Sequence, residues 1–287
     1  FSHDFKNIFH DKKNGLTKII FVNVVLFLAV NIADEILKLF TKNFSLVYLL
    51  ALRGEITFAL QHCWTFITYM FLHKDIFHIL FNMLWLYWLG KIFIEYVGSK
   101  RFVGVYLLGG ISGGVLYLIT ANIFPQYFQN SFLLGASAGV MAVVISIAVL
   151  LPDYIIHLLF FGGVRLKYLA LFSFVFTSLL DISQNTGGKI SHIGGALFGF
   201  VFMIQYKKGT DITVWLNNFM DYVIRIFINK KPKMKISYKK KMSDENYNAS
   251  KIAKQKHTDE ILDKISKAGY ESLTKEEKDF LFRASSK

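Results

Sequence analysis

The stretch Gly135-Ala136-Ser137-Ala138-Gly139 places a serine between small residues near the start of an apolar run. A second apolar run further along the chain begins close to His192. A serine hydroxyl is a weak nucleophile until a neighbouring base accepts its proton, and a neutral histidine is the usual base. The two residues therefore matter chemically only if the fold brings them together.

The composition indicates a membrane protein. Hydrophobic residues make up 53% of the 287-residue chain, and 29 residues are Phe, which is more apolar surface than one soluble core usually buries. Apolar runs of roughly the length that crosses a bilayer recur along the chain. They cover residues 19–32, 76–93, 102–124, 132–151, 166–180 and 190–206. The expected fold is an all-α bundle of six transmembrane helices with a cytoplasmic C-terminal amphipathic helix and tail.

The net charge is +13, and most of the excess positive charge lies beside the apolar runs or in the tail. Positive charge in these places indicates how a protein is oriented in the membrane. No nucleic-acid partner is therefore expected. The loops expected on the inner side carry the basic residues Lys91, Lys100, Arg101, Arg165, Lys167, Lys207 and Lys208. Both termini are therefore expected in the cytoplasm, at a bacterial-type inner membrane. The single cysteine, Cys63, cannot form an internal disulfide.

Three of the predicted helices carry polar residues to the same depth. Each polar residue lies 14 positions from the inner end of its helix, in the pairs Ser137 and Leu151, His192 and Tyr206, and Asn82 and Tyr96. At 1.5 Å per residue, each lies about 21 Å above the inner end, in the outer half of a core about 30 Å thick. His78 lies one turn further out, on the same helix face as Asn82. A serine, two histidines and an asparagine are thus predicted to meet near one level.

This set of residues suits acyl transfer. Attack by Ser137 on a carbonyl creates an oxyanion, which an asparagine amide, a histidine N–H and the N–H groups at a helix start can stabilise. Small residues around a serine are otherwise more typical of packing between membrane helices. No strand is evident in the sequence before the serine, so the pattern is not interpreted as the elbow of soluble hydrolases. Asp153 is expected at an inner helix end, and Asp181 is interpreted as a loop or capping residue, with orientation of His192 as the alternative. The residues favour a Ser-His dyad.

The residues from His73 to Met83, Gly135-Ala136-Ser137 and His192-Ile193-Gly194-Gly195 with Gly199 resemble the rhomboid intramembrane serine proteases. The resemblance covers roughly residues 19–206. It implies a six-helix bundle that cleaves single-span membrane substrates near the outer membrane face. It also implies Ser137 as nucleophile, His192 as base, and Asn82 and His78 with the Ser137 backbone as oxyanion donors. Gly195 and Gly199 are then expected to pack the last membrane helix against the serine helix, with Gly135 close to the site.

The sequence departs from the common family pattern at three positions. Thr65 follows Trp64 where many members have arginine, and Ala138 follows the nucleophile where many have glycine. Met141 stands where an aromatic residue often packs on the catalytic histidine, and a thioether packs there more loosely. These departures leave reaction rate and substrate preference open. A catalytically inactive rhomboid-like binding or chaperone protein is the alternative function.

The chain is predicted to divide into five parts. The full division is a basic lead at 1–18, the membrane domain at 19–206, an amphipathic interfacial helix at 207–229, a lysine-rich linker at 230–257 and a short helical hairpin at 258–287. The lysines of residues 230–241 suit anionic lipid headgroups. No metal or cofactor is expected, because the histidines lack ligating companions at suitable spacing.

Overall fold

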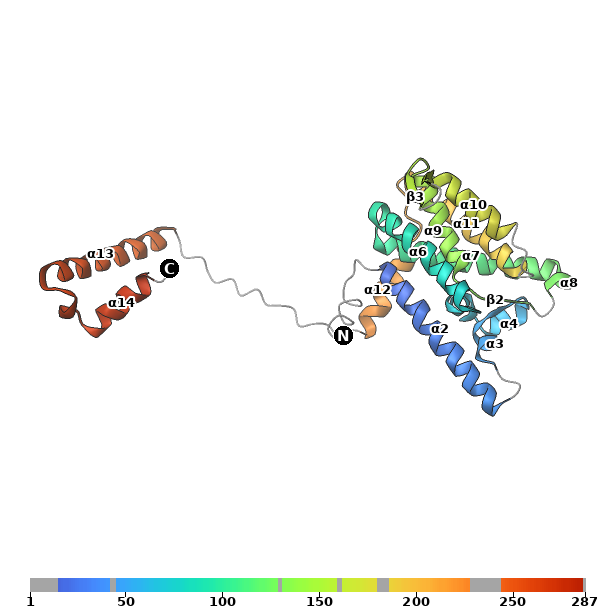
Figure 1. The fold of residues 1–287 in the computed structure, drawn as a ribbon, viewed down its shortest axis with the longest axis horizontal. Helices are drawn as coiled ribbons and strands as arrows, with labels where there is room; N and C mark the ends of the chain where they lie inside the picture. Colours follow the sequence, from blue (N-terminus) through green and yellow to red (C-terminus); the bar gives the residue numbers. More distant parts are fainter. Residues whose placement is uncertain are drawn as a thin grey trace. The chain divides into compact units, whose positions relative to one another are not determined.

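The structure, a computed structural model, describes residues 15–41, 45–128, 131–158, 162–179, 186–227 and 244–285 (Figure 1). The chain forms two units, Phe1–Ile228 and Asn229–Lys287. The predicted lysine segment at 230–241 and most of the predicted basic lead lie outside the described residues.

Each of the six predicted apolar runs contains a helix. Four helices are long and apolar enough to cross a membrane, namely α2 (Gly15–Phe40), α6 (Ile76–Val97), α7 (Ser99–Ile123) and α11 (Thr186–Lys207). The apolar helices α9 (Ser137–Leu150) and α10 (Leu166–Ser178) are shorter, with 14 and 13 residues. At 1.5 Å per residue they extend only about 20 Å, against a hydrocarbon core of about 30 Å. The structure thus gives four candidate spans and two shorter apolar helices in the place of six spans.

The segment between α2 and α6 consists of short elements. They are α3 (Leu46–Leu50), β1 (Leu52–Arg53), α4 (Ile56–Gln61), α5 (Thr65–Thr68) and the 3-10 turn η1 (Tyr69–Phe71). Between α7 and α9 lie α8 (Pro125–Phe128) and β2 (Phe132–Leu133), and β2 pairs antiparallel with β1. Leu52 is opposite Leu133 in this pairing. The segment before α6 is thereby fixed next to the start of α9.

Helix α9 occupies the centre of the first unit and packs between α7 and α11 (Figure 1). Small residues spaced four apart line these contacts, namely Gly109 and Gly113 on α7, Ala138 and Ala142 on α9, and Gly195 and Gly199 on α11. A side chain at Gly195 would run into the carbonyl of Ala138, and one at Gly109 into the methyl group of Ala142. Such small residues let helix backbones approach closely in a membrane. The expected packing of α11 on α9 through Gly195 and Gly199 matches this geometry.

Two ion pairs hold the amphipathic helix α12 (Val214–Phe227) to the start of α7. Arg101 Nε lies 2.7 Å from Asp211 Oδ2, and Lys100 Nζ lies 2.7 Å from Asp221 Oδ2. The first pair is better shielded from water than the second, because the Asp211 side chain is 15% exposed and the Asp221 side chain 41%.

Between α9 and α10, β3 (Ile155–Leu158) and β4 (Gly162–Arg165) form an antiparallel hairpin.

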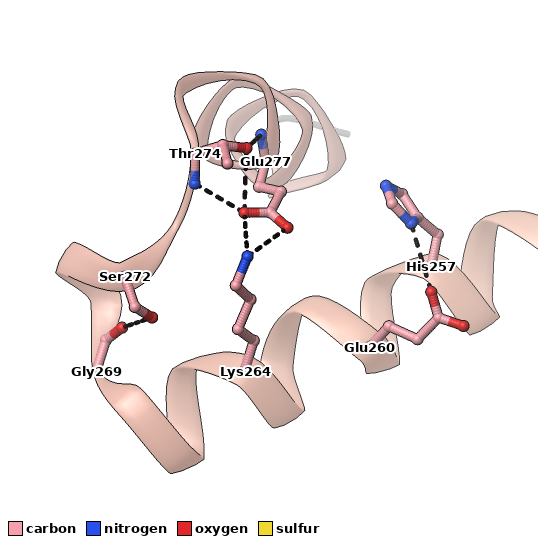
Figure 2. Close-up of polar contacts among 7 residues, drawn as sticks. All are labelled: His257, Glu260, Lys264, Gly269, Ser272, Thr274 and Glu277. Carbon is pink, nitrogen blue, oxygen red and sulfur yellow. Dashed lines mark hydrogen bonds and ion pairs between the residues drawn. The ribbon is translucent and has the colours of Figure 1, made fainter.

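The second unit is a helical hairpin of α13 (Asp244–Ala268), the 3-10 turn η2 (Tyr270–Ser272) and α14 (Lys275–Ser285). Figure 2 shows Thr274 and Glu277 in a reciprocal capping box, in which the Thr274 N–H donates to Glu277 Oε2 at 2.7 Å. Lys264 of α13 reaches the same carboxylate, with Nζ 3.0 Å from Oε1. Helix α13 begins earlier than expected, so the predicted linker to residue 257 is too long. The reason is that residues 244–268 contain neither Gly nor Pro to interrupt a helix.

Candidate active site

Ser137 and His192 form a hydrogen-bonded pair. His192 Nε2 lies 2.7 Å from Ser137 Oγ, and both residues are half-buried. Ser137 is the first residue of α9, because the preceding Gly135 adopts a φ of 123° and so ends the extended chain in a turn that side chains rarely permit. His192 lies one turn before Gly195, whose contact with the backbone of Ala138 draws α11 against α9. The structure thus brings together the two residues that the sequence selects.

The segment before α6 holds the turn that precedes the serine. The Gly135 N–H donates to the carbonyl of Tyr69 at 2.9 Å, and the Ala136 N–H points to His73 Nε2 at 3.5 Å. The His78 ring lies directly against Gly135, only 2.9 Å from where a Cβ atom would stand. With two amides committed in this way, the next N–H groups toward the hydroxyl are those of the first turn of α9, which lack acceptors within the helix.

His73 is suited to accepting a hydrogen bond. Its side chain is 4% exposed, and its ring lies edge-on to that of His78 with 5.0 Å between ring centroids. Burial lowers the pKa of His73 to about 3, and the neighbouring His78 acts in the same direction. His73 is therefore neutral near pH 7. If Nε2 accepts from Ala136, the ring proton lies on Nδ1.

The two predicted oxyanion donors are placed differently. His78 lies beside the serine turn, and its backbone N–H is capped by Asp75 Oδ1 at 2.9 Å. Asn82 is buried one turn further along α6, but its Nδ2 donates to the carbonyl of His78 at 2.8 Å. Within the described residues, no hydrogen bond joins Asn82 to Ser137. The Asn82 amide nitrogen has two N–H groups, and the His78 carbonyl takes one of them.

The positions that depart from the family pattern all have structural partners. Ala138 fits between α7 and α11, where a side chain on Gly113 would meet its methyl group. Met141 is buried at 5% exposure, one turn along α9 from Ser137. Thr65 is fully buried, and its hydroxyl donates to the carbonyl of His62 at 2.7 Å. Arg53 lies in the same segment as Thr65, and its guanidinium is 4.2 Å from the ring centroid of Phe58.

Three contacts at this site were not expected from the sequence. The Tyr69 carbonyl and the His73 ring hold the serine turn, and the Thr177 carbonyl lies 3.3 Å from His192 Nδ1. The role of His73 could have been suspected from the sequence, since His73 opens the stretch that ends at Asn82. A contact made by a backbone carbonyl leaves no mark in the sequence.

The two aspartates between Ser137 and His192 are placed as follows. Asp153 is exposed, and its carboxylate lies 2.7 Å from the Lys167 ammonium, whereas Asp181 lies outside the described residues. Among the described residues, no three His, Cys, Asp or Glu side chains gather in a way that would hold a metal ion.

The helices, the small-residue contacts and the serine-histidine pair are features of one family of membrane proteins. Residues 60–208 match the Rhomboid domain, so the chain belongs to the rhomboid family, which confirms the resemblance. The matched range contains Ser137, His192, His78 and Asn82. Residues 242–287, which include the helical hairpin, match a family of unknown function.

Several rhomboid relatives show similarity over about half of the chain. RHOMBOID-like protein 12, mitochondrial, of Arabidopsis thaliana is 32% identical over 160 residues, which cover 50% of this chain and 47% of the relative. Presenilin-associated rhomboid-like protein, mitochondrial, of Mus musculus is 27% identical over 158 residues, covering 51% and 38%. Rhomboid-like protease 1 of Toxoplasma gondii is 31% identical over 157 residues, covering 53% and 50%. The chain thus spans half or less of the length of these relatives, and their names give no support to the expected bacterial inner membrane.

Proposed function

We propose that this protein is an intramembrane serine endopeptidase in which Ser137 is the nucleophile and His192 the general base. The observation that carries the proposal is the 2.7 Å distance between Ser137 Oγ and His192 Nε2. Membership of the rhomboid family and the word protease in the name of one relative support the same reaction class. The proposed substrates are single-span membrane proteins, because the site lies within a bundle whose outward surface is rich in exposed apolar side chains.

The proposed reaction proceeds by acyl transfer. Ser137 Oγ attacks a substrate carbonyl carbon while its proton moves to His192 Nε2. The oxyanion forms near the first turn of α9, where the N–H groups of Ser137 and its neighbours can donate. His192 then gives its proton to the departing amine as the peptide bond breaks. A water molecule attacks the acyl-enzyme, passes its proton to His192, and the carboxylate product leaves as Ser137 recovers its proton.

The geometry refines the expected oxyanion donors. We propose that the backbone of α9 supplies the principal donors and that His78, beside Gly135, supplies a further one. Asn82 contributes through the second N–H of its amide, because the first donates to the His78 carbonyl. The proposal also includes six membrane helices with both termini on the cytoplasmic side, since α9 and α10 are apolar and lie among the longer helices.

The test uses the full chain reconstituted with a reporter that has one transmembrane segment. Ser137→Ala and His192→Ala should each abolish cleavage, and Ser137→Ala should also abolish labelling by a fluorophosphonate probe. Ser173→Ala is a matched control, because Ser173 is buried in α10 and its hydroxyl donates only to the carbonyl of Leu169 in its own helix. Cleavage that survives either dyad substitution refutes the mechanism. A folded parent protein that neither cleaves nor reacts with the probe supports the non-catalytic alternative.

A further inference from the structure

The second nitrogen of the catalytic histidine faces the end of another helix. His192 Nδ1 lies 3.3 Å from the carbonyl oxygen of Thr177, the penultimate residue of α10. An α-helix leaves its last four carbonyl groups without partners inside the helix. Because α10 ends at Ser178, no N–H group within α10 donates to the Thr177 oxygen, which can accept a hydrogen bond from outside the helix.

The contacts of His192 with Ser137 and Thr177 fit one distribution of ring protons. For Ser137 to donate its proton, Nε2 must carry a lone pair, and a neutral imidazole then carries its only proton on Nδ1. A carbonyl oxygen accepts and never donates, so the Thr177 contact also requires a proton on Nδ1. The Thr177 carbonyl therefore favours the tautomer that a general base needs, and the Ser137 hydroxyl can donate to that tautomer.

The end of α10 also carries a favourable charge. The C-terminus of an α-helix has a partial negative charge, which stabilises a nearby cation. His192 becomes a cation when it accepts the proton of Ser137, and in serine hydrolases a buried carboxylate usually stabilises this state. Of the two aspartates between Ser137 and His192 in the sequence, Asp153 is exposed and paired with Lys167, and Asp181 lies outside the described residues.

We propose that the C-terminal end of α10, acting through the Thr177 carbonyl, positions His192 in its catalytic tautomer and stabilises its protonated form. This inference rests on the proposed serine protease function. The contact is made by the backbone alone, since the Thr177 hydroxyl donates to the carbonyl of Ser173 within α10. The side chain of Thr177 is consequently dispensable, while the place of the helix end is not.

The burial of one face of α10 determines where the end of this helix lies. Along α10, Ala170, Ser173 and Ser178 are buried at 2%, 6% and 3% exposure, so one face of the helix packs inward. The opposite face exposes apolar side chains, namely Tyr168, Leu171, Phe172 and Phe176. The contact between α10 and His192 thus depends on the packing of one helix face against the rest of the unit.

The decisive variant makes a single carbonyl oxygen a weaker hydrogen-bond acceptor. An ester in place of the amide between Thr177 and Ser178, introduced by nonsense suppression in the full chain, makes the Thr177 oxygen a poorer acceptor. The matched control is the same ester between Leu171 and Phe172, two exposed residues of α10, which also removes one helical N–H.

Two readouts are required. The ester at Thr177 should lower kcat about tenfold with little change in KM, because a hydrogen bond to a charged group is lost in the step that protonates His192. The control ester between Leu171 and Phe172 should stay within about twofold of the parent. Nitrogen-15 NMR of ring-labelled His192 in the unaltered protein at pH 7.5 should show the Nδ1–H tautomer, and the Thr177 ester should reduce its population.

The outcomes separate the two proposals. An Nε2–H tautomer in the unaltered protein, or equal kcat for the Thr177 ester and the control ester, overturns the positioning role while leaving the dyad intact. Undiminished cleavage by Ser137→Ala instead overturns the protease mechanism. The NMR measurement on the unaltered protein decides the tautomer even if the Thr177 ester fails to fold.

Discussion

Gly195 of α11 lies against the main-chain carbonyl of Ala138 on α9, so that no side chain fits between the two helices at this point. Ala138 directly follows Ser137, and Gly195 follows His192 by one helical turn. The distance between nucleophile and base is therefore set by how closely the two backbones approach. The same contact affects both stability and chemistry.

Gly195→Ala should push α11 away from α9 and lengthen the Ser137–His192 hydrogen bond. We expect a loss of roughly 1–3 kcal/mol in the free energy of unfolding, which is typical of an overpacked site, together with slower fluorophosphonate labelling. Thermal denaturation in detergent and the labelling rate measure the two effects. Leu197→Ala is the control, because Leu197 is on the same helix and 55% exposed. Labelling of Gly195→Ala at the parental rate would contradict this account.

His73 should make stability depend on pH in the mildly acidic range. Its pKa is about 3 in the folded protein, against an ordinary value of 6.5, because burial opposes its charged form. The unfolded chain therefore takes up a proton first, and stability falls as the pH drops from 6.5 towards 3. His73→Phe should flatten this part of a curve of melting temperature against pH. His157→Phe, which removes an exposed histidine, should leave the parental slope, and an unchanged slope in His73→Phe would refute the assignment.

Asp211 should anchor α12 more firmly than Asp221 does. Burial opposes the ionisation of Asp211, but hydrogen bonds from Thr213 and Arg101 outweigh it and lower its pKa below 3.8. The stabilisation is thus complete above pH 3.8 and is lost as the pH falls through the folded pKa. Asp211→Asn should weaken the start of α12 by about 1 kcal/mol or more.

The measurement is amide hydrogen exchange of residues 214–227 in the full chain at neutral pH. Asp221→Asn is the comparison, and it should change exchange little, because its pair with Lys100 is largely exposed and such pairs contribute about 0–1 kcal/mol. Equal acceleration of exchange in the two variants would show that shielding from water does not distinguish the pairs.

The exposed apolar stripe of α12 should lie in the lipid interface, as the proposed cytoplasmic amphipathic helix requires. Trp215, Phe219, Tyr222 and Ile226 recur at helical spacing, and each is about 60% exposed. With Cys63→Ser as background, an environment-sensitive dye on Phe219→Cys should emit at shorter wavelength and be quenched by brominated lipid. The same dye on Asn218→Cys should respond much less.

The lysines of residues 230–241 give this prediction a lipid dependence. Quenching at position 219 should increase when vesicles contain anionic lipid and fall at high salt, because exposed charges are screened over about 10 Å at 0.1 M salt. Quenching that is equal at positions 218 and 219 would argue against an oriented interfacial helix. A dye response that depends on protein concentration and not on lipid would assign the stripe to contact between copies of the chain.

The pairing of Ser137 and His192 could be predicted because helix rise is constant and the basic residues mark helix ends. Depth alone, however, says nothing about rotation around a helix axis. Asn82 shares the predicted depth, yet its amide bonds to the carbonyl of His78 in its own helix. The same limit applies to span length, since Gly135 starts the serine helix later than the apolar run at 132–151 suggests.

The contacts made by irregular backbone were beyond the reach of sequence patterns. Tyr69 acts on the serine turn through its carbonyl, and its hydroxyl donates to the carbonyl of Gly110 at 2.6 Å. The segment between α2 and α6 has no single period, because its short helices and strand are fixed by tertiary contacts such as the pairing of β1 with β2. Hydrophobic periodicity therefore located the helices but not the polypeptide that supports the serine turn.

The Thr177 carbonyl at the end of α10 differs from a side-chain partner in how mutations can affect it. Every amino acid supplies a main-chain oxygen, so no codon change at position 177 can delete this partner of His192. Saturation mutagenesis would record position 177 as tolerant, and sequence drift there would leave the reaction intact. Loss of function would arise from insertions, deletions or helix-breaking changes that shift where α10 ends. The length of this helix, more than the identity of its residues, is the quantity on which selection would act.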